Sequence, residues 1–395
     1  MTWPTKKLVE VCEIIKSGIT PFEGEKEYID TNSVQNFSIV KFQIITYQKR
    51  PSRANMEAKR DDVLVAKMKD TVKVYLVTPK DEKKRIFSTG FFVLKPKKNL
   101  IEPKYLFLYC SSNLFQNLKD ELTRGSTQKA INDEKLKRYF QIPLPSIKIQ
   151  KRIVARIEEL FEKIDKVKEL RQKAQEQTAQ IFQSALQEIF SKAEKKWGVK
   201  KLGEVCRINP SKAELRNVSN NLEVSFIPMS AVDDVNGSII TQEKKSLGKV
   251  KKGYTYFKED DVLFAKITPC MENGKSAIAE NLINDIGFGS TEFHILRPLD
   301  KVLSKWIYFY IRQSWFREEA KRHFTGTAGQ QRVPQEFLER TEIPLPPLSE
   351  QKKIVAYLDT LREKVEKLKQ LQQNQLKDLE ELKKSILDKA FKGKL

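Results

Sequence analysis

A segment of 29 residues occurs twice in this chain, and this repeat constrains the fold more than any other feature. Residues 142–170 read IPLPSIKIQKRIVARIEELFEKIDKVKEL, and residues 343–371 read IPLPPLSEQKKIVAYLDTLREKVEKLKQL. Aligned without a gap, 15 of the 29 positions are identical. Because the copies are 201 residues apart, the repeated unit is a whole domain with its following helix rather than a short solenoid repeat.

The segment after each IPLP motif is predicted to form a long helix. The prolines fix an extended backbone before it, and no proline or glycine follows between Pro145 and Gly198. Apolar residues then recur at alternating spacings of four and three, which is typical of the seam of a coiled coil. They are Ile153, Ile157, Leu160, Ile164 and Val167 in the first copy and Ile354, Leu358, Leu361, Val365 and Leu368 in the second. Each helix is expected to span about 45–50 residues, or roughly 70 Å, with a polar layer at the glutamine-rich stretches 172–180 and 372–375.

The segments before the two helices also repeat each other. The motif DDVLVAK at 61–67 returns as DDVLFAK at 260–266. The segments Lys16–Arg60 and Pro210–Gly253 do not match, so the two units share a framework and differ in what their variable segments contact. In the first unit a helix is expected from Glu102 or Pro103 to Leu118. Strands are expected at Val34–Tyr47, Asp62–Lys67, Val72–Val77 and Phe87–Leu94.

These patterns predict an α+β fold with an internal pseudo-two-fold duplication. We expect two similar α/β globular domains at residues 1–145 and 195–346, joined by two long antiparallel coiled-coil helices at residues 146–194 and 347–395. The helices are expected to run antiparallel because a domain of about 150 residues has a radius of gyration near 15 Å. Such a domain cannot bridge the far ends of a helix of roughly 70 Å.

The net charge of +21 indicates a polyanionic partner. The excess lies mainly on the globular segments, with +10 on residues 1–145 and +5 on residues 195–342. Charge alone fits RNA, DNA or an anionic membrane surface. No apolar run approaches the ~18 residues of a membrane span, and the N-terminus lacks the apolar core of a secretory signal. The four cysteines show no metal-binding spacing, so we expect a cytoplasmic protein.

No motif for catalysis is found. Asn273-Gly-Lys-Ser resembles the tail of a phosphate-binding loop, but Pro269 stands where the loop needs its first glycine. The Asp133-Glu-Lys triplet resembles a nuclease motif, yet such triplets are common when 32% of residues are charged. His294 and His323 have no nucleophile at a usable spacing. We therefore expect no catalytic residues, no metal site and no cofactor in this chain.

Duplicated basic units that each end in IPLP and a long helix resemble the specificity subunit of type I restriction–modification enzymes. The resemblance covers essentially the whole chain and also includes TPCMENGK at 268–275 and GTAGQQRV at 326–333. It implies two target-recognition domains, each reading one half of a bipartite, asymmetric site in double-stranded DNA. It also implies that the helices set the spacing of the half-sites and dock two modification subunits and the restriction subunits. S-adenosylmethionine, ATP and Mg²⁺ would then belong to those partners.

The glycine-led loop before each IPLP motif supplies most of the candidate DNA-binding residues. The loop at 125–131, GSTQKAI, corresponds to the loop at 326–333 but lacks its second glycine. Glutamine can pair with adenine through two hydrogen bonds, and arginine or lysine can pair with guanine. The alternative is that the loops only brace each domain against its helix. The candidates are Gln128, Lys129, Gln330, Gln331 and Arg332 in the loops, and Lys49, Arg50 and Arg53 in the first variable segment.

Two other classes of function compete with DNA recognition. A basic coiled-coil scaffold that binds acidic partners would show no sequence preference in competition binding. A nuclease would cleave DNA as an isolated chain when a divalent metal is supplied.

Overall fold

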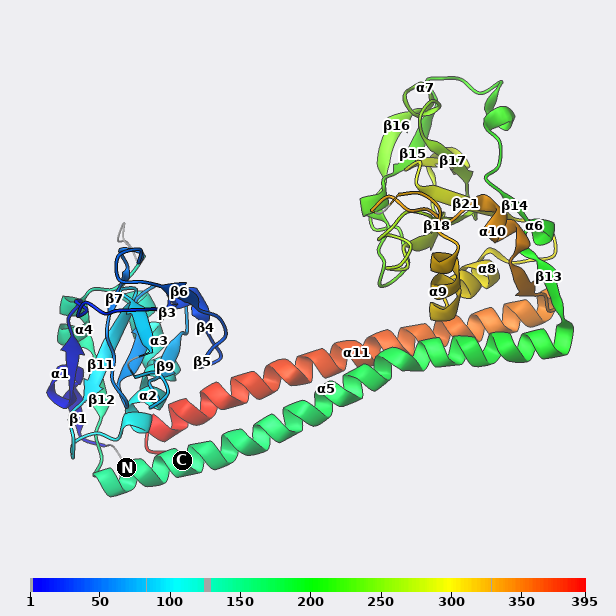
Figure 1. Cartoon of the computed structure of the whole chain (residues 1–395). Coiled ribbons are helices and arrows are strands. Elements are labelled where there is room, and N and C mark those ends of the chain that lie inside the picture. Colours follow the sequence, from blue (N-terminus) through cyan, green and yellow to red (C-terminus); the bar gives the residue numbers. More distant parts are fainter. Residues whose placement is uncertain (1–2, 83, 124–128, 328) are drawn as a thin grey trace. The chain divides into compact units, whose positions relative to one another are not determined.

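The computed structural model describes residues 3–82, 84–123, 129–327 and 329–395, and the chain divides into two compact units. Unit 1 comprises Met1–Gln172 and Gln373–Leu395, and unit 2 comprises Lys173–Gln372. Each unit contains one globular domain and a part of both long helices, α5 (Ile147–Trp197) and α11 (Leu348–Phe391), as Figure 1 shows.

The globular part of unit 1 is built on two four-stranded sheets, with strand orders β6-β3-β10-β7 and β2-β11-β8-β9. The helices are α1 (Leu8–Val11), the 3-10 helix η1 (Thr31–Ser33), α2 (Pro103–Ser111), α3 (Asn113–Glu121) and α4 (Asp133–Tyr139). The strands are β1 (Thr5–Lys7), β2 (Cys12–Ile15), β3 (Lys26–Ile29), β4 (Val34–Gln35), β5 (Ser38–Ile39), β6 (Gln43–Ile45), β7 (Ala54–Met56), β8 (Val63–Ala66), β9 (Val74–Leu76), β10 (Arg85–Ser88), β11 (Phe91–Pro96) and β12 (Gln141–Pro143).

Unit 2 repeats this topology, with sheets ordered β16-β15-β20-β17 and β14-β21-β18-β19. In both units the second and third strands of the first sheet are parallel. The helices are α6 (Leu202–Val205), η2 (Lys212–Leu215), η3 (Met229–Ala231), α7 (Leu247–Val250), η4 (Ile283–Asp285), α8 (Ser304–Ile311), α9 (Ser314–Arg322) and α10 (Gln335–Arg340). The strands are β13 (Val199–Lys201), β14 (Cys206–Ile208), β15 (Glu223–Ile227), β16 (Glu243–Ser246), β17 (Thr255–Lys258), β18 (Val262–Ala265), β19 (Ser276–Ile278), β20 (Ile286–Gly289), β21 (Phe293–Pro298) and β22 (Glu342–Pro344).

The repeated DDVL motif forms the most deeply buried strand of each unit. All four residues of β8 and all four of β18 are buried, because each strand lies between two others and is covered on both faces. Side chains alternate along a strand, so Val63 and Val65 join the core under α2 and α3, whereas Leu64 and Ala66 join the core between the sheets. Residues 262–265 divide in the same way in unit 2. A continuous apolar run is what a strand buried on both faces requires.

Three predicted elements are interrupted in the structure. The strand expected at Val34–Tyr47 is three short strands, because Asn36 and Phe37 have positive φ values of 45° and 62° and turn the chain. The strand expected at Phe87–Leu94 is divided between β10 and β11. The helix expected up to Leu118 breaks at Ser112, whose backbone is extended and whose hydroxyl accepts a hydrogen bond from the amide of Phe115. Ser112 therefore starts a second helix as its N-cap.

A buried glutamine explains one identical position of the 29-residue repeat. The side chain of Gln150 is 0% exposed; it accepts a hydrogen bond from the amide of Glu102 (2.9 Å) and donates to the carbonyl of Pro145 (2.8 Å). Gln351 makes the same two bonds in unit 2, with Leu303 (3.0 Å) and Pro346 (2.8 Å). Each glutamine ties the start of a long helix to the loop before α2 or α8.

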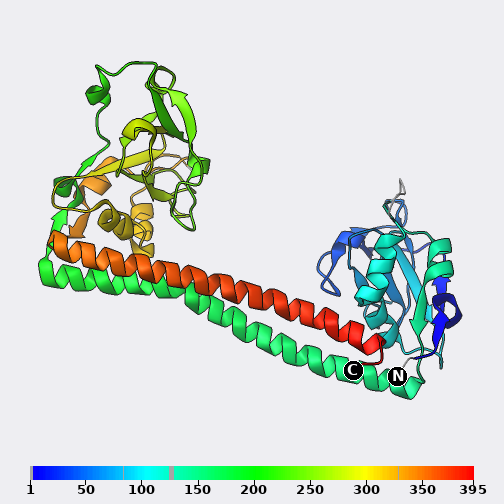
Figure 2. The ribbon, with the colours of Figure 1, turned by 180° about the vertical axis from the view of Figure 1, so that it is seen from behind.

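An aromatic residue near the end of each long helix packs on the globular domain of its unit. In unit 1 the Phe391 ring of α11 lies 5.0 Å from Tyr105 and 5.3 Å from Tyr109. In unit 2 the Phe190 ring of α5 lies 4.5 Å from Trp306, the counterpart of Tyr105. Figure 2 shows the same two units from behind.

The parts of α5 and α11 that share a unit run antiparallel. In unit 1, Asp165 pairs with Lys383 (2.5 Å) and Lys168 with Glu380 (2.6 Å), so the numbers fall along α11 as they rise along α5. In unit 2, the amide of Gln372 donates to the hydroxyl of Thr178 (2.9 Å), within the stretch where a polar layer is predicted.

The residues predicted to form the seam are buried or half-buried, except at the last predicted position of each helix, where the prediction is wrong. Ile157 and Leu358 are both 0% exposed. Val167 and Leu368 are 39% and 40% exposed and therefore lie off the buried stripe. Among the described residues, no helix has the length and apolar character needed to cross a lipid bilayer.

Candidate nucleic-acid interface

The structure brings the end of each glycine-led loop against the end of the DDVL strand. In unit 1 the amide of Ile131 donates to the carbonyl of Lys67 (3.1 Å), and the amide of Lys69 donates to the carbonyl of Lys129 (2.9 Å). In unit 2 the amide of Val333 donates to the carbonyl of Lys266 (2.9 Å). The amide of Thr268 likewise donates to the carbonyl of Gln331 (3.0 Å).

These matched bonds establish how the two loops correspond, although the first loop lacks the second glycine. Lys129 is the counterpart of Gln331, and Ala130, which bridges to Met68, is the counterpart of Arg332, which bridges to Ile267. By the same register Gln128 is the counterpart of Gln330. Gln128 itself lies outside the described residues.

The candidate side chains of the loops differ in their freedom. Lys129 and Gln330 are exposed and Gln331 is half-buried. Arg332 is held: its Nε and Nη2 atoms donate to the two carboxylate oxygens of Glu292 at 2.8 and 2.9 Å. These hydrogen bonds lower the pKa of Glu292 and raise that of Arg332. Arg332 also donates to the carbonyl of Gln330 (2.8 Å), so its guanidinium links Glu292 to the loop backbone.

At the matching described positions of unit 1, the ion pair between Arg332 and Glu292, here called the fork, has no equivalent. Ala130 stands in the place of Arg332. Gly90 stands in the place of Glu292. The carbonyl of Gly90 accepts a hydrogen bond from the amide of Lys67, and the carbonyl of Glu292 accepts one from the amide of Lys266. Both members of the pair are replaced together by small residues, so the two loops are held by different means.

Of the three candidates in the first variable segment, Arg53 lies nearest to the loop. Its carbonyl accepts a hydrogen bond from the amide of Thr89 (2.9 Å). The next residue, Gly90, accepts a hydrogen bond from the amide of Lys67. Arg50 instead places its guanidinium 3.9 Å from the centre of the Tyr47 ring. Lys49 is exposed in the same connection between β6 and β7. Backbone hydrogen bonds thus connect the segments that carry Arg53, Lys67 and Lys129 in unit 1.

Sequence reasoning missed Lys67 and its counterpart Lys266. Both side chains are half-buried, and burial lowers the pKa of both amines. The Lys67 amine lies 3.9 Å from Asp133 and 4.7 Å from the centre of the Phe92 ring. The signal was present, because each lysine ends the repeated DDVL motif. The strand pattern gave no reason to single out its last residue.

The residues considered for catalysis have structural partners. His294 binds the carbonyl of Val333 (2.8 Å), and burial lowers its pKa. Asp133 faces Lys67 and begins α4 rather than joining an acidic cluster. Burial raises the pKa of the Cys12 and Cys206 thiols to about 12. Within the described ranges, no group of three or more His, Cys, Asp or Glu side chains is placed to hold a metal ion.

Comparison with known proteins gives one consistent result. The family model of the type I restriction modification DNA specificity domain matches residues 1–176 and again residues 194–378. The chain is 36% identical over 187 residues to the type I restriction enzyme EcoEI specificity subunit of Escherichia coli, which covers 47% of this chain and 31% of that protein. The chain thus matches about a third of the length of its E. coli relatives EcoEI and EcoAI.

Two solved structures are similar along the whole chain. One, from work on complex assembly and conformational transition of the type I R-M system, is 29% identical with a TM-score of 0.74, covering 100% of this chain and 98% of that chain. The other is the HsdS subunit from Thermoanaerobacter tengcongensis, also 29% identical, with a TM-score of 0.61 and coverage of 100% and 97%.

Proposed function

The chain belongs to the family of type I restriction-modification DNA specificity domains, and we propose that it selects the DNA sequence for a type I restriction–modification complex. In this proposal residues 1–145 and 195–346 are two target-recognition domains, each reading one half of a bipartite, asymmetric site. Residues 146–194 and 347–395 form an antiparallel coiled coil that fixes the spacing between the half-sites.

The proposal is supported chiefly by the matched hydrogen bonds between each glycine-led loop and the end of its DDVL strand. Two domains of one topology each present a loop held against a DDVL strand, and the loop residues differ between the domains. A shared scaffold with different side chains at equivalent positions is what reading two different half-sites requires. The net charge of +21 supplies attraction to phosphates that does not depend on sequence.

We assign the base contacts to Gln128 and Lys129 in one half and to Gln330 and Gln331 in the other. Lys67, Lys266 and Arg53 lie at the loop bases and are suited to phosphate contacts. Arg332 affects recognition of the second half-site indirectly, because its bond to Glu292 holds the loop in position. Lys49 and Arg50 are assigned to the flanking backbone of the first half.

The long helices carry exposed apolar side chains that come in equivalent sets, and this supports docking of two like partners. Unit 1 exposes Val167 (39%), Leu170 (66%) and Leu382 (46%). At positions shifted by 201 residues, unit 2 exposes Leu368 (40%), Leu371 (51%) and Ile181 (43%). Exposed apolar sets of this kind mark protein interfaces. We propose that each set docks one modification subunit and that restriction subunits join the resulting complex.

Catalysis in this proposal belongs to those partners. S-adenosylmethionine, ATP and Mg²⁺ would bind to the modification and restriction subunits, and the chain described here would hold no cofactor. A scaffold without sequence preference is the competing function.

The test is to co-express the chain with its modification subunit and map methylated adenines across genomic DNA. We expect one gapped motif, with two short specific halves around an unspecified spacer. Gln331→Ala should change one half only, and Lys129→Ala should change the other half only. Methylation without a gapped motif, or no stable complex, would instead favour the scaffold.

A further inference from the structure

Each unit carries a short hairpin that packs on a domain helix, α2 in unit 1 and α8 in unit 2. In unit 1, β4 and β5 pair, and the amide of Val40 donates to the carbonyl of Ser33 (2.9 Å). In unit 2, Val232 bridges to Ile239, and the amide of Ile240 donates to the carbonyl of Ala231 (2.9 Å). We call residues 33–40 and 231–240 the matched hairpins.

The matched hairpins rest on equivalent residues of α2 and α8. Phe37 contacts the ring of Phe107 with centroids 5.4 Å apart. At the position shifted by 201 residues, the Tyr308 hydroxyl donates to the carbonyl of Gly237 (3.0 Å). The hairpin therefore packs on the same position of the domain helix in both units, although its sequence differs.

In unit 2 the hairpin is held firmly by its backbone. Arg312 donates to the carbonyls of Asp234 (3.1 Å) and Val235 (2.9 Å). Gly237 has a φ of +61°, and a β-carbon there would lie 2.1 Å from Arg312 Nη1 and 2.3 Å from the Tyr308 hydroxyl. These contacts fix the tip and turn the Val235 side chain to solvent.

The hairpins and the strand after the first one expose apolar side chains. Val235 is 67% exposed and Ile240 is 60% exposed in unit 2. In unit 1, Val40, Phe42 and Ile44 are 54%, 51% and 50% exposed. Apolar side chains presented on a rigid, repeated element are typical of a surface that another molecule covers.

The sequence of the hairpin segments favours a protein over DNA as that molecule. Residues 217–243 contain four Asp or Glu and no Lys or Arg, and residues 17–40 contain four Asp or Glu and one Lys, in a chain of net charge +21. Acidic segments repel phosphates, whereas DNA-facing surfaces are basic. In unit 2 the acidic segment also contacts Lys275 and Arg312, which donate to its backbone carbonyls. The covering molecule is therefore a protein surface that contacts mainly the exposed apolar side chains.

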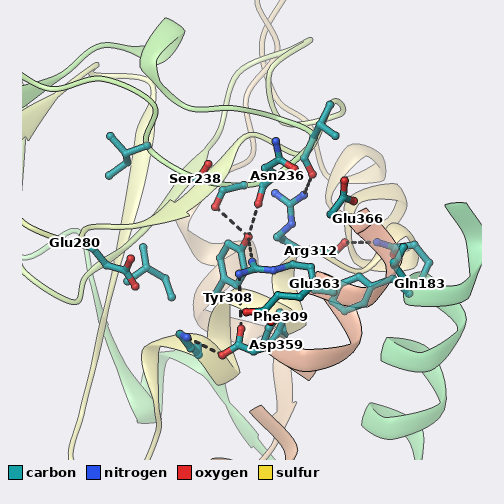
Figure 3. Close-up of a pocket in the computed structure, with 18 of the residues that line it drawn as sticks. Gln183, Asn236, Ser238, Glu280, Tyr308, Phe309, Arg312, Asp359, Glu363 and Glu366 are labelled. Carbon is teal, nitrogen blue, oxygen red and sulfur yellow. Dashed lines mark hydrogen bonds and ion pairs between the residues drawn. The ribbon is translucent and has the colours of Figure 1, made fainter. Parts of the chain in front are cut away.

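In unit 2 the hairpin adjoins the exposed face of α11 across a cavity of about 530 Å³, shown in Figure 3. Val235, Asn236 and Ser238 line one side of it, and residues of α11 line another. Glu366 and Lys369, which flank the exposed Leu368, are among those α11 residues. A partner seated on Leu368 and Leu371 would thus reach the hairpin across this cavity, whose lining also includes Lys305, Arg312 and Arg362.

We propose that the matched hairpins are a second docking element for the modification subunits, and this inference rests on the proposed function. Each subunit would seat on the exposed apolar set of one unit's helices and also cover that unit's hairpin. It would bring apolar side chains to Val235 and Ile240, or to Val40 and Phe42.

The test compares the Val235→Ser, Ile240→Ser double variant of the full chain with the wild type. Both side chains are exposed, so the unfolding midpoint should not change. We expect about ten-fold weaker binding of the purified modification subunit by calorimetry, since lost apolar contacts raise the dissociation rate. Binding of a DNA duplex carrying the selected motif to the chain alone should be unchanged. Leu299→Ser, which removes an apolar side chain that is 42% exposed and outside the cavity lining, is the matched control and should bind normally.

Each of the other outcomes contradicts one part of this proposal. If the double variant binds the modification subunit as tightly as the wild type, the hairpin is not a docking element. If it loses DNA affinity instead, the hairpin contacts DNA, and if it abolishes self-association seen by ultracentrifugation, the covering molecule is a second copy of the chain. A wild type that binds no modification subunit overturns the proposed function, and this inference falls with it.

Discussion

The two units differ most clearly in single residues at the base of the glycine-led loop. Unit 2 has a charged fork between Arg332 and Glu292, and unit 1 has Ala130 and Gly90 at the same places. A bidentate arginine–carboxylate pair fixes direction as well as distance. The fork therefore orders Gln330 and Gln331 before any ligand arrives, and the first loop must be ordered in another way.

Loss of the fork should relax one half-site only. Arg332→Ala is expected to reduce base selectivity in the half read by unit 2 by about ten-fold, or ~1.4 kcal/mol. Selection from a randomised DNA pool measures this. Glu292→Gln removes the charge at nearly constant volume and should relax the same half. Equal relaxation of both halves would show that the effect is a general loss of folding rather than of loop position.

The second aspartate of each DDVL motif provides another contrast between the units at the residue scale. Asp62 is 4% exposed and accepts a hydrogen bond from the amide of Lys59 (2.8 Å); burial raises its pKa to about 6. The equivalent Asp261 accepts two hydrogen bonds from Arg297, at 2.8 and 2.7 Å. Burial also raises the pKa of Asp261, but Arg297 opposes that rise, whereas the Lys59 amide and the charges of Lys95 and Lys59 oppose it at Asp62.

Asp62→Asn should stabilise the protein above pH 6. Because the pKa of Asp62 is raised above its unfolded value of about 3.9, the folded protein keeps a proton that the unfolded chain releases. Wild-type stability therefore falls as the pH rises from about 4 to about 6 and then levels off. The variant should lack this loss, giving a gain on the order of 2 kcal/mol at pH 8 and none near pH 4 in urea unfolding.

Asp261→Asn is the matched control and should have the opposite effect. It leaves the Arg297 charge without its buried partner, which costs about 3 kcal/mol in similar cases. A destabilising effect of Asp62→Asn at pH 8 would contradict the assigned pKa shift.

At the scale of elements, the repeated IPLP segment works as a joint between domain and helix. Gln150 and Gln351 are each 0% exposed and each satisfy backbone groups on both sides of the joint. A buried amide or carbonyl that loses its partner costs more than the bond contributes. The identity of these positions in the repeat is therefore explained by backbone satisfaction rather than by helix packing.

Gln150→Ala and Gln351→Ala are each expected to lower the free energy of unfolding by about 1–3 kcal/mol. Urea unfolding followed by circular dichroism measures the change. Gln172→Ala, at an exposed position of α5, is the control and should change stability by less than about 0.5 kcal/mol. If all three variants behave alike, the joint does not depend on these bonds.

At the scale of the whole molecule, α5 and α11 are each continuous helices of 51 and 44 residues that contribute to both units. Contacts within unit 1 and within unit 2 both run antiparallel. A change in helix length is therefore expected to move one recognition domain relative to the other while leaving both domains intact.

A four-residue insertion after Gln175, matched by one beside Gln373, should lengthen the unspecified spacer without changing either half-site. It adds about 6 Å of helix, which corresponds to roughly two base pairs of B-DNA. Mapping of methylated adenines reads the result directly. Gln175→Ala without insertion should leave the spacer as it is. Altered half-sites would contradict the assignment of the helices to spacing.

Much of the fold could be predicted from sequence because its signals are local or repeated. The duplication, the two long helices and the DDVL strands follow from identity and from apolar periodicity. The break at Ser112, the turn at Asn36 and the exposure of Val167 could not be predicted. Each depends on backbone turns or neighbours that the apolar pattern does not encode.

The sequence by itself determined that the chain is two copies of one domain-plus-helix, since repetition and periodicity are properties of the chain alone. Only the tertiary structure decided which loop residues correspond, because Lys129 and Gln331 are matched by bonds to strands about 60 residues away. It also showed that Arg332 pairs with Glu292 and that the backbones of Lys67 and Lys266 bond to the ends of the loops. These roles depend on partners that folding brings together, and no pattern along the sequence specifies them.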